Sequence, residues 1–228
     1  MTFLDDAQHF AETALVAIAA LLPIVDPLGG APIYLVMTTG LTPPERARMA
    51  QLVAINSFVL LVASILVGAY VLDFFGVSIP AVQVAGGFIV CAIAWSLLTS
   101  PSTPAVSERS TAAAPEALSQ RAFYPITMPL TVGPGSISVA MTLGANPPKG
   151  IRSLVTTAAA HIVGVFVVAV SIYLCYRYAD RILRKLGTTG TNVLIRLTAF
   201  ILFCIGVQIM WNGLRTLLLS LLRPTLAS

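Results

Sequence analysis

Six long apolar stretches set the fold that this chain can adopt. The segments between them hold nearly all of the charged residues, and the stretches themselves cover residues 13–38, 49–72, 78–99, 123–145, 151–174 and 191–213. A helix needs about 20 mostly apolar residues to cross roughly 30 Å of hydrocarbon, so each stretch is long enough to span a membrane. The sequence therefore predicts an all-α membrane protein with six transmembrane helices, whose main partner is the lipid bilayer.

The composition excludes several other classes of protein. The chain is 57% hydrophobic and only 10% charged, whereas a soluble domain is close to half apolar and about a quarter charged. Its 13 basic residues exceed its 9 acidic residues by only four and are widely scattered, so no nucleic-acid partner is expected. The three cysteines form no C-x-x-C pair and lie near no histidine cluster, so neither a metal site nor a cofactor is expected.

The distribution of basic residues predicts the orientation of the helices. Residues 1–12 contain no Lys or Arg, so they lack the basic region of a cleavable signal peptide and the first apolar stretch is expected to stay as a span. With six spans, the odd-numbered loops carry eight Lys and Arg residues and the opposite side carries four. Since basic loops stay in the cytoplasm, both termini are predicted to be periplasmic.

The two halves of the chain carry similar interruptions. A Ser-, Thr-, Ala- and Pro-rich segment at 100–122 reads as a flexible cytoplasmic linker between a first three-helix repeat, 1–99, and a second, 123–228. The first span contains Asp26-Pro27-Leu28-Gly29-Gly30 and the fourth contains Gly133-Pro134-Gly135-Ser136. Three spans per repeat is an odd number, so the second repeat must be inverted. Inverted repeats with helices broken at corresponding positions point to a secondary transporter.

Each interruption has the residues that start a new helix. Proline suits the first helical position and aspartate suits the N-cap before it, so Pro27 and Pro134 are expected to begin half-helices. Two such N-termini meeting near the midplane would offer unpaired amides and partial positive charge to a carboxylate. The simpler alternative is that both are ordinary proline kinks, which are common in membrane helices.

Asp26 and Arg196 are the charged residues that most need an explanation. A carboxylate near mid-membrane costs roughly 3 kcal/mol, so Asp26 either caps a half-helix or binds a substrate ammonium, a coupling proton or Na⁺. Arg196 lies about five residues inside the sixth span. Its side chain either extends to the interface or reaches inward to Asp26 or a substrate carboxylate. With polar groups on neighbouring spans, the candidate solute-binding residues are Asp26, Pro27, Gly29, Gly30, Asn56, Thr131, Gly133, Pro134, Gly135, Ser136 and Arg196.

No pattern in the chain indicates an enzyme. It has no H-E-x-x-H, G-x-S-x-G, P-loop or dinucleotide-binding motif. Asp26 also has no second intramembrane carboxylate with which to form a protease dyad. We therefore expect no catalytic residues.

Four runs resemble the MarC family, in matching order and spacing, and the resemblance extends over nearly the whole chain outside the central linker. They are PIVDPLGGAPIY from Pro23, FGVSIPAVQVAGG from Phe75, PITMPLTVGPGSIS from Pro125 and RLTAFILFCIGVQIMWNGL from Arg196. The resemblance implies a bacterial inner-membrane protein of six spans. It also implies a link to neutral amino-acid transport, because some relatives are classed as neutral amino-acid transporters.

These observations lead to one favoured function and one alternative. The favoured function is secondary transport of a small zwitterionic solute, expected to be a neutral amino acid, bound between the two half-helix N-termini. The alternative is a non-transporting inner-membrane assembly or regulatory protein. That alternative predicts a helical bundle without a polar cavity at the breaks and without solute-dependent stabilisation.

Overall fold

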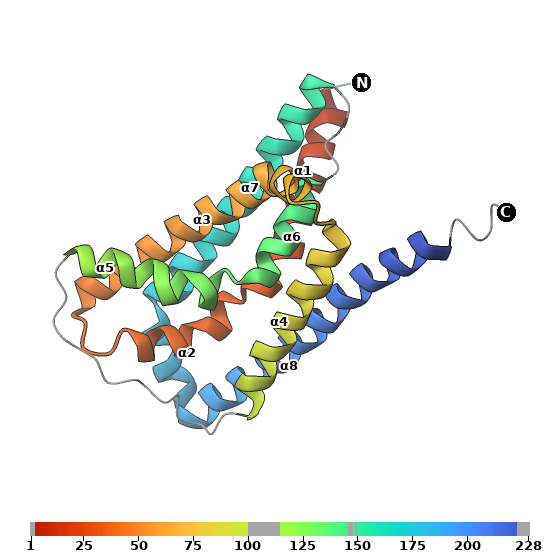
Figure 1. Ribbon diagram of the computed structural model, residues 1–228. Helices are drawn as coiled ribbons and strands as arrows, with labels where there is room; N and C mark the ends of the chain where they lie inside the picture. Colours follow the sequence, from red (N-terminus) through yellow and green to blue (C-terminus); the bar gives the residue numbers. More distant parts are fainter. Residues whose placement is uncertain (1–2, 100–114, 146–147, 149, 223–228) are drawn as a thin grey trace.

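A computed structural model describes residues 3–99, 115–145, 148 and 150–222 of the chain. All of the regular elements in this part of the chain are helices (Figure 1), which confirms the all-α prediction for the described residues. In chain order they are α1 (Phe3–Val25), α2 (Pro27–Met37), α3 (Pro43–Phe74), α4 (Ile79–Thr99), α5 (Pro115–Arg121), η1 (Ala122–Thr131), α6 (Pro134–Gly144), α7 (Ile151–Arg177) and α8 (Ala179–Leu222).

The helices match the apolar stretches closely. Five segments of the described residues are long and apolar enough to cross a membrane: Ala7–Leu35, Pro43–Phe74, Ile79–Thr99, Ile151–Arg177 and Thr189–Ser220. The fourth apolar stretch is instead a pair, Leu118–Thr131 and Pro134–Gly144, bent by 73° at its break. By length and composition, the described residues thus contain five candidate spans, or six if the bent pair crosses the membrane as one.

Local sequence explains where the helices begin and bend. Pro43 begins α3, and the Glu45 carboxylate accepts hydrogen bonds from the backbone N–H and the hydroxyl of Thr42, at 2.8 and 2.6 Å, which is a capping box. Gly187 has a φ of 68° and kinks α8 near its start. The predicted linker lies outside the described residues at 100–114, and the next seven residues form α5.

Small residues allow the helices to pack closely. A Cβ on Gly87 of α4 would approach the backbone oxygen of Gly206 in α8 to 2.6 Å, and one on Gly213 of α8 would approach that of Pro80 to 2.5 Å. On the neighbouring face of α4, Gly86 lies against Ser138 of α6. Close approach of backbones through small residues is a common way for helices to associate in lipid, and here it places α4 between α6 and α8.

The connections between helices sort to two ends of the molecule. The start of α1, the end of α8 and the α3–α4 turn lie toward the upper right of Figure 1. The α2–α3 loop and the α7–α8 junction lie toward the lower left. The largest buried side chains, among them Tyr34 and Tyr176, belong to the helices that surround the two breaks.

Candidate functional site

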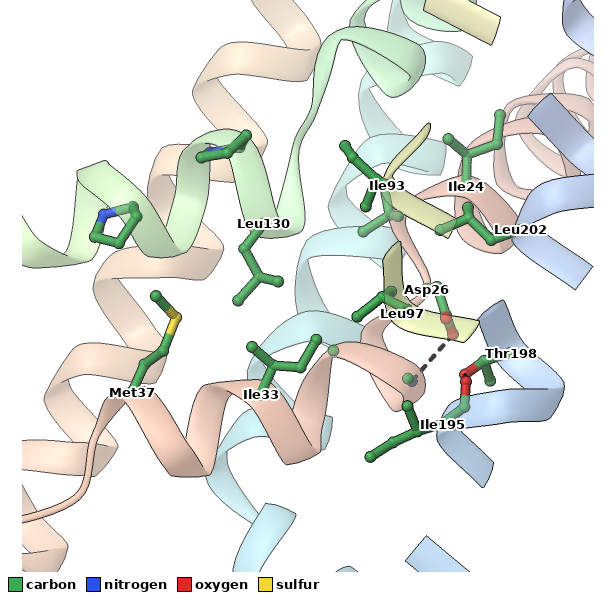
Figure 2. A pocket seen from close by; sticks show the side chains of 15 residues that line it. Ile24, Asp26, Ile33, Met37, Ile93, Leu97, Leu130, Ile195, Thr198 and Leu202 are labelled. Atoms are coloured by element: carbon green, nitrogen blue, oxygen red, sulfur yellow. Dashed lines mark hydrogen bonds between the residues drawn. The ribbon is translucent and has the colours of Figure 1, made fainter. Parts of the chain in front are cut away.

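The first break is a single residue wide. Helix α1 ends at Val25 and α2 begins at Pro27, with Asp26 alone between them at a φ of 42°. This left-handed conformation is one that aspartate tolerates better than most residues. The Asp26 carboxylate accepts a hydrogen bond from the Gly29 backbone N–H at 3.0 Å (Figure 2). Asp26 is therefore the N-cap of α2, as the Asp-Pro sequence predicted.

The second break is longer and has no capping side chain. After η1, Val132 and Gly133 are extended, and α6 begins at Pro134 with Gly133 as its N-cap. Gly133 has no side chain with which to cap α6, and the Ser136 hydroxyl donates to the Gly133 carbonyl at 2.9 Å. Since a helix N-terminus carries about half a positive charge and unpaired N–H groups, the amides of α6 remain available to an anion.

The half-helix before the second break differs from its counterpart. Segment η1 contains Pro125 and Pro129, and the residue before each of them, Tyr124 and Met128, has extended backbone angles. Proline removes a backbone donor and disfavours the α conformation in the residue before it. A regular α-helix like α1 therefore cannot form here.

Tyr176 of α7 contacts both breaks. Its hydroxyl lies 2.9 Å from the Thr131 Oγ1 at the end of η1. The same hydroxyl would be 2.6 Å from a Cβ added to Gly30, in the first turn of α2. The Tyr176 ring stacks on Tyr34 with centroids 4.5 Å apart, and Tyr176 is completely buried. One aromatic side chain thus fixes the distance between the two interrupted helices.

A cavity of about 270 Å³, called here the Asp26 pocket, opens beside the first break. Figure 2 shows Asp26 and Thr198 at one end of this pocket, and Ile33, Leu130 and Met37 extending away from them. Asp26 and Thr198 are the polar side chains that line it. The pocket therefore has one acidic end and a long apolar remainder.

A smaller cavity of about 40 Å³, called here the Gly133 pocket, lies at the N-terminus of α6. It is lined by Thr131, Gly133, Pro134, Gly135 and Ser136, and it has room for one or a few water-sized groups. The two pockets adjoin each other, because both are lined by the same five side chains: Ile24, Ile93, Pro129, Leu130 and Leu202. The Asp26 carboxylate and the N-terminus of α6 thus border adjoining pockets that share part of their apolar lining.

The structure brings most of the predicted site residues together. Asp26, Gly29 and Gly30 line the first pocket, and five residues of the second break line the other. Pro27 is buried as the first residue of α2.

Two predicted residues lie elsewhere. Asn56 is half-buried on α3 and lines neither pocket. The exposed Arg196 also lines neither pocket, because α8 turns Ile195, Thr198 and Leu202 toward Asp26. Residues one position apart on a helix point about 100° apart, so Arg196 faces away from the pocket. The structure does not support the alternative in which the Arg196 side chain reaches Asp26 or a solute carboxylate.

Sequence reasoning missed two polar residues of the site. Thr198 is one threonine in an apolar span, where such a side chain commonly bonds its own helix, as it does here to the Leu194 carbonyl at 2.8 Å. Tyr176 lies near the end of its span, where tyrosines commonly anchor helices at the interface. A helical-face analysis of α8 from Ile195 would have found Thr198, since positions three apart share a face.

Comparison with known sequences identifies the family of the chain. Residues 11–218 match the family described as "MarC family integral membrane protein". The chain belongs to the MarC family. It is therefore a multi-pass inner-membrane protein, in agreement with its apolar helices.

Curated relatives align along most of their length. The inner membrane protein MarC of Salmonella arizonae is 31% identical over 202 residues, which cover 86% of this chain and 91% of that relative. A membrane protein of Methanocaldococcus jannaschii is 30% identical over 215 residues, which cover 94% of this chain and all of the relative. No solved structure matches the chain at a significant level.

Proposed function

We propose that this MarC-family protein is a secondary transporter of a small zwitterionic solute, and that the solute is a neutral amino acid. The observation that carries the proposal is the pairing of opposite charges across adjoining pockets. The Asp26 carboxylate lies in one pocket, and the uncapped N-terminus of α6 borders the other. A zwitterion carries an ammonium group that can bind the Asp26 carboxylate and a carboxylate that can bind the amides of α6.

In this proposal the two breaks have different tasks. Asp26 binds the solute ammonium, or the coupling proton or Na⁺, at the acidic end of the Asp26 pocket. The amides of Gly135 and Ser136 bind the solute carboxylate, because backbone N–H groups at a helix N-terminus favour anions. Asp26 already neutralises the N-terminus of α2 through its bond to Gly29, so the carboxylate is assigned to α6 alone.

The apolar part of the Asp26 pocket favours solutes with an uncharged side chain. Ile33, Leu130 and Met37 line the part of the Asp26 pocket that extends away from its acidic end (Figure 2). A pocket of about 270 Å³ lies just below the roughly 300–1,000 Å³ range of drug-sized sites, which suits a small solute. A charged side chain there would lose its hydration without a partner.

The transport mechanism rests on the two broken helices. Non-helical backbone at membrane depth is tolerated where it is buried or lines a cavity, and both breaks meet that condition. We propose that the repeats 1–99 and 123–228 are inverted relative to each other, that six spans place both termini in the periplasm, and that the protein is a carrier rather than an enzyme.

A solute screen tests the proposal directly. Purified protein is heated with each amino acid, with and without Na⁺ and at several pH values. A bound solute stabilises the folded state in proportion to the logarithm of its concentration over its dissociation constant. We expect a shift with leucine-like amino acids and none with the amine or the carboxylic acid that lacks one of the two charged groups. Uptake into proteoliposomes should follow the same order.

The same screen separates the proposal from a non-transporting membrane component. An assembly or regulatory protein would show no stabilisation by any solute and no uptake under a proton or Na⁺ gradient. Equal stabilisation by the single-charge analogues would also contradict the proposal, because it requires both ends of the site.

A further inference from the structure

A third cavity lies on the outer side of the bundle, away from the two breaks. It runs between α3 and α7, has a volume of about 420 Å³ and is lined by Gln51, Ala54, Ile55, Phe58, Phe166, Ala169, Val170 and Tyr173. Several of these side chains are exposed, including Ile55 at 49% and Phe166 at 58%. This α3–α7 groove faces lipid in a membrane-embedded protein.

The two ends of the groove differ in their side chains. At one end, Phe58 and Phe166 meet edge to face with centroids 6.3 Å apart. Gln51 precedes Phe58 by seven residues and Tyr173 follows Phe166 by seven, so both lie toward the other end of the groove, because α3 and α7 run antiparallel (Figure 1). The groove therefore changes along its length from an aromatic end at Phe58 and Phe166 to a more polar end at Gln51 and Tyr173, called here the rim.

Two arginines extend the groove beyond that rim. On α3, Arg48 precedes Gln51 by three residues and Ile55 by seven. On α7, Arg177 follows Tyr173 by four residues. Residues three, four and seven apart share a helix face, so both arginines continue the groove-lining stripes of their helices. Both are exposed.

The nearby carboxylates are already engaged. Glu45 accepts hydrogen bonds from Thr42, and Asp180 forms an ion pair with Arg184 at 2.5 Å. Among the described residues, neither Arg48 nor Arg177 has a carboxylate partner. Among the described residues near the rim, basic side chains outnumber the carboxylates of Glu45 and Asp180, so the rim carries a net positive charge; the basic residues are Arg46, Arg48, Arg177, Arg181, Arg184 and Lys185.

The length of the groove distinguishes between possible occupants. From Arg48 to Phe58 is ten residues, or about 15 Å along α3, which is half of the roughly 30 Å hydrocarbon core. An acyl chain in one leaflet covers that depth. A second copy of the chain packed through α3 and α7 would be expected to use the full span instead.

We propose that the α3–α7 groove binds an anionic phospholipid. One acyl chain lies over Ile55, Val170 and Phe166, and the phosphate is bound by Arg48 and Arg177. Arginine binds phosphate oxygens in a forked, two-bond geometry, and basic pockets between transmembrane helices bind anionic headgroups. This inference is independent of the transport function.

Native mass spectrometry of the full chain in mixed micelles tests this proposal. The probes are phosphatidylglycerol and phosphatidylcholine with identical acyl chains. Each arginine near the surface contributes about fivefold to anionic-lipid binding, so we expect phosphatidylglycerol to be preferred by about 25-fold. Arg48→Gln or Arg177→Gln should each reduce that preference about fivefold, and the double variant should abolish it. Arg215→Gln, an exposed arginine of α8, is the matched control and should leave it unchanged.

A second variant tests the chain-binding half of the groove. Val170→Trp fills the groove but keeps both arginines, so it should weaken phosphatidylglycerol binding at least tenfold. Inorganic phosphate should not displace the lipid. Equal binding of the two lipids by the unmodified protein would by itself overturn the proposal. The proposal would also be overturned if free phosphate displaced phosphatidylglycerol, or if the unmodified protein formed a dimer that Val170→Trp dissociates.

Discussion

The two helix breaks look alike in sequence but differ in how their new helix begins. At the first break, one residue separates α1 from α2, and its carboxylate caps α2. At the second, Val132 and Gly133 separate η1 from α6, the axis bends by 73°, and the N-cap Gly133 has no side chain to cap the new helix. One break thus carries its own anion and the other leaves its amides open. Matched Pro and Gly positions fix where a helix is interrupted, and the N-cap residue fixes the charge that the interruption presents.

The largest expected effect comes from neutralising the first break. Asp26→Asn keeps an amide side chain that still caps α2, so the melting temperature should change little. The ammonium partner is lost, and truncating one member of a buried charge pair costs roughly 2–5 kcal/mol. We therefore expect solute affinity to fall at least 30-fold, measured by the solute-dependent thermal shift. Asp73→Asn, an exposed carboxylate at the end of α3, is the control. Unchanged transport by Asp26→Asn would remove Asp26 from the site.

The next effect tests the close packing around that carboxylate. A Cβ on Gly29 would collide with the Asp26 Oδ2 and come within 2.7 Å of the Thr198 Oγ1. Overpacking of this kind costs about 1–3 kcal/mol, so Gly29→Ala should lower the melting temperature and displace the Asp26 side chain. In Gly190→Ala, by comparison, the added Cβ meets the Leu186 side chain at 3.1 Å, and a smaller loss is expected. Equal losses for the two variants would show that the Asp26 side chain adapts freely.

A third variant makes the second break resemble the first. Gly133→Asp places a carboxylate at the N-cap of α6, where it competes with the solute carboxylate for the same amides. We expect solute affinity to fall by about tenfold, or about 1.4 kcal/mol, in binding assays. Gly133→Asn caps the helix without the negative charge and should have a smaller effect. If Gly133→Asp binds the solute as tightly as the unmodified protein, no anion binds at α6.

The smallest effect concerns the link between the breaks. Tyr176→Phe removes the hydroxyl that lies 2.9 Å from Thr131 but keeps the stack on Tyr34. A hydrogen bond of this kind contributes about 0.5–1.5 kcal/mol, and thermal unfolding should reveal a loss of that size. Tyr178→Phe, at an exposed tyrosine, is the control. A loss no larger than that of Tyr178→Phe would show that the hydrogen bond does not hold the breaks together.

The sequence predicted the positions of the breaks because their cause is local. Pro27 and Pro134 cannot continue the hydrogen bonding of a preceding helix, and Asp26 is a strong N-cap residue wherever it lies. Both half-helices begin at the predicted prolines. Five of the six apolar stretches likewise correspond to helices long enough to span a membrane, since bilayer thickness sets the length of a span.

The remaining features of the site depend on how the helices are rotated against one another. The packing of α8 on α4 turns Thr198 toward Asp26 and leaves Arg196 outside the pocket. The sequence of one helix alone does not determine that rotation. The contact of Tyr176 with both breaks joins residues far apart in the chain. The irregular η1 follows from Pro125 and Pro129, yet two prolines alone do not specify a 73° bend.

The one-residue joint at the first break has a mechanical consequence. Since Asp26 alone separates α1 from α2, any change in the direction of α2 relative to α1 must turn the backbone torsions of that residue. Those same torsions aim its carboxylate into the cavity. Tilting the half-helix and re-aiming the charge are therefore a single movement, and a ligand that holds one also restrains the other.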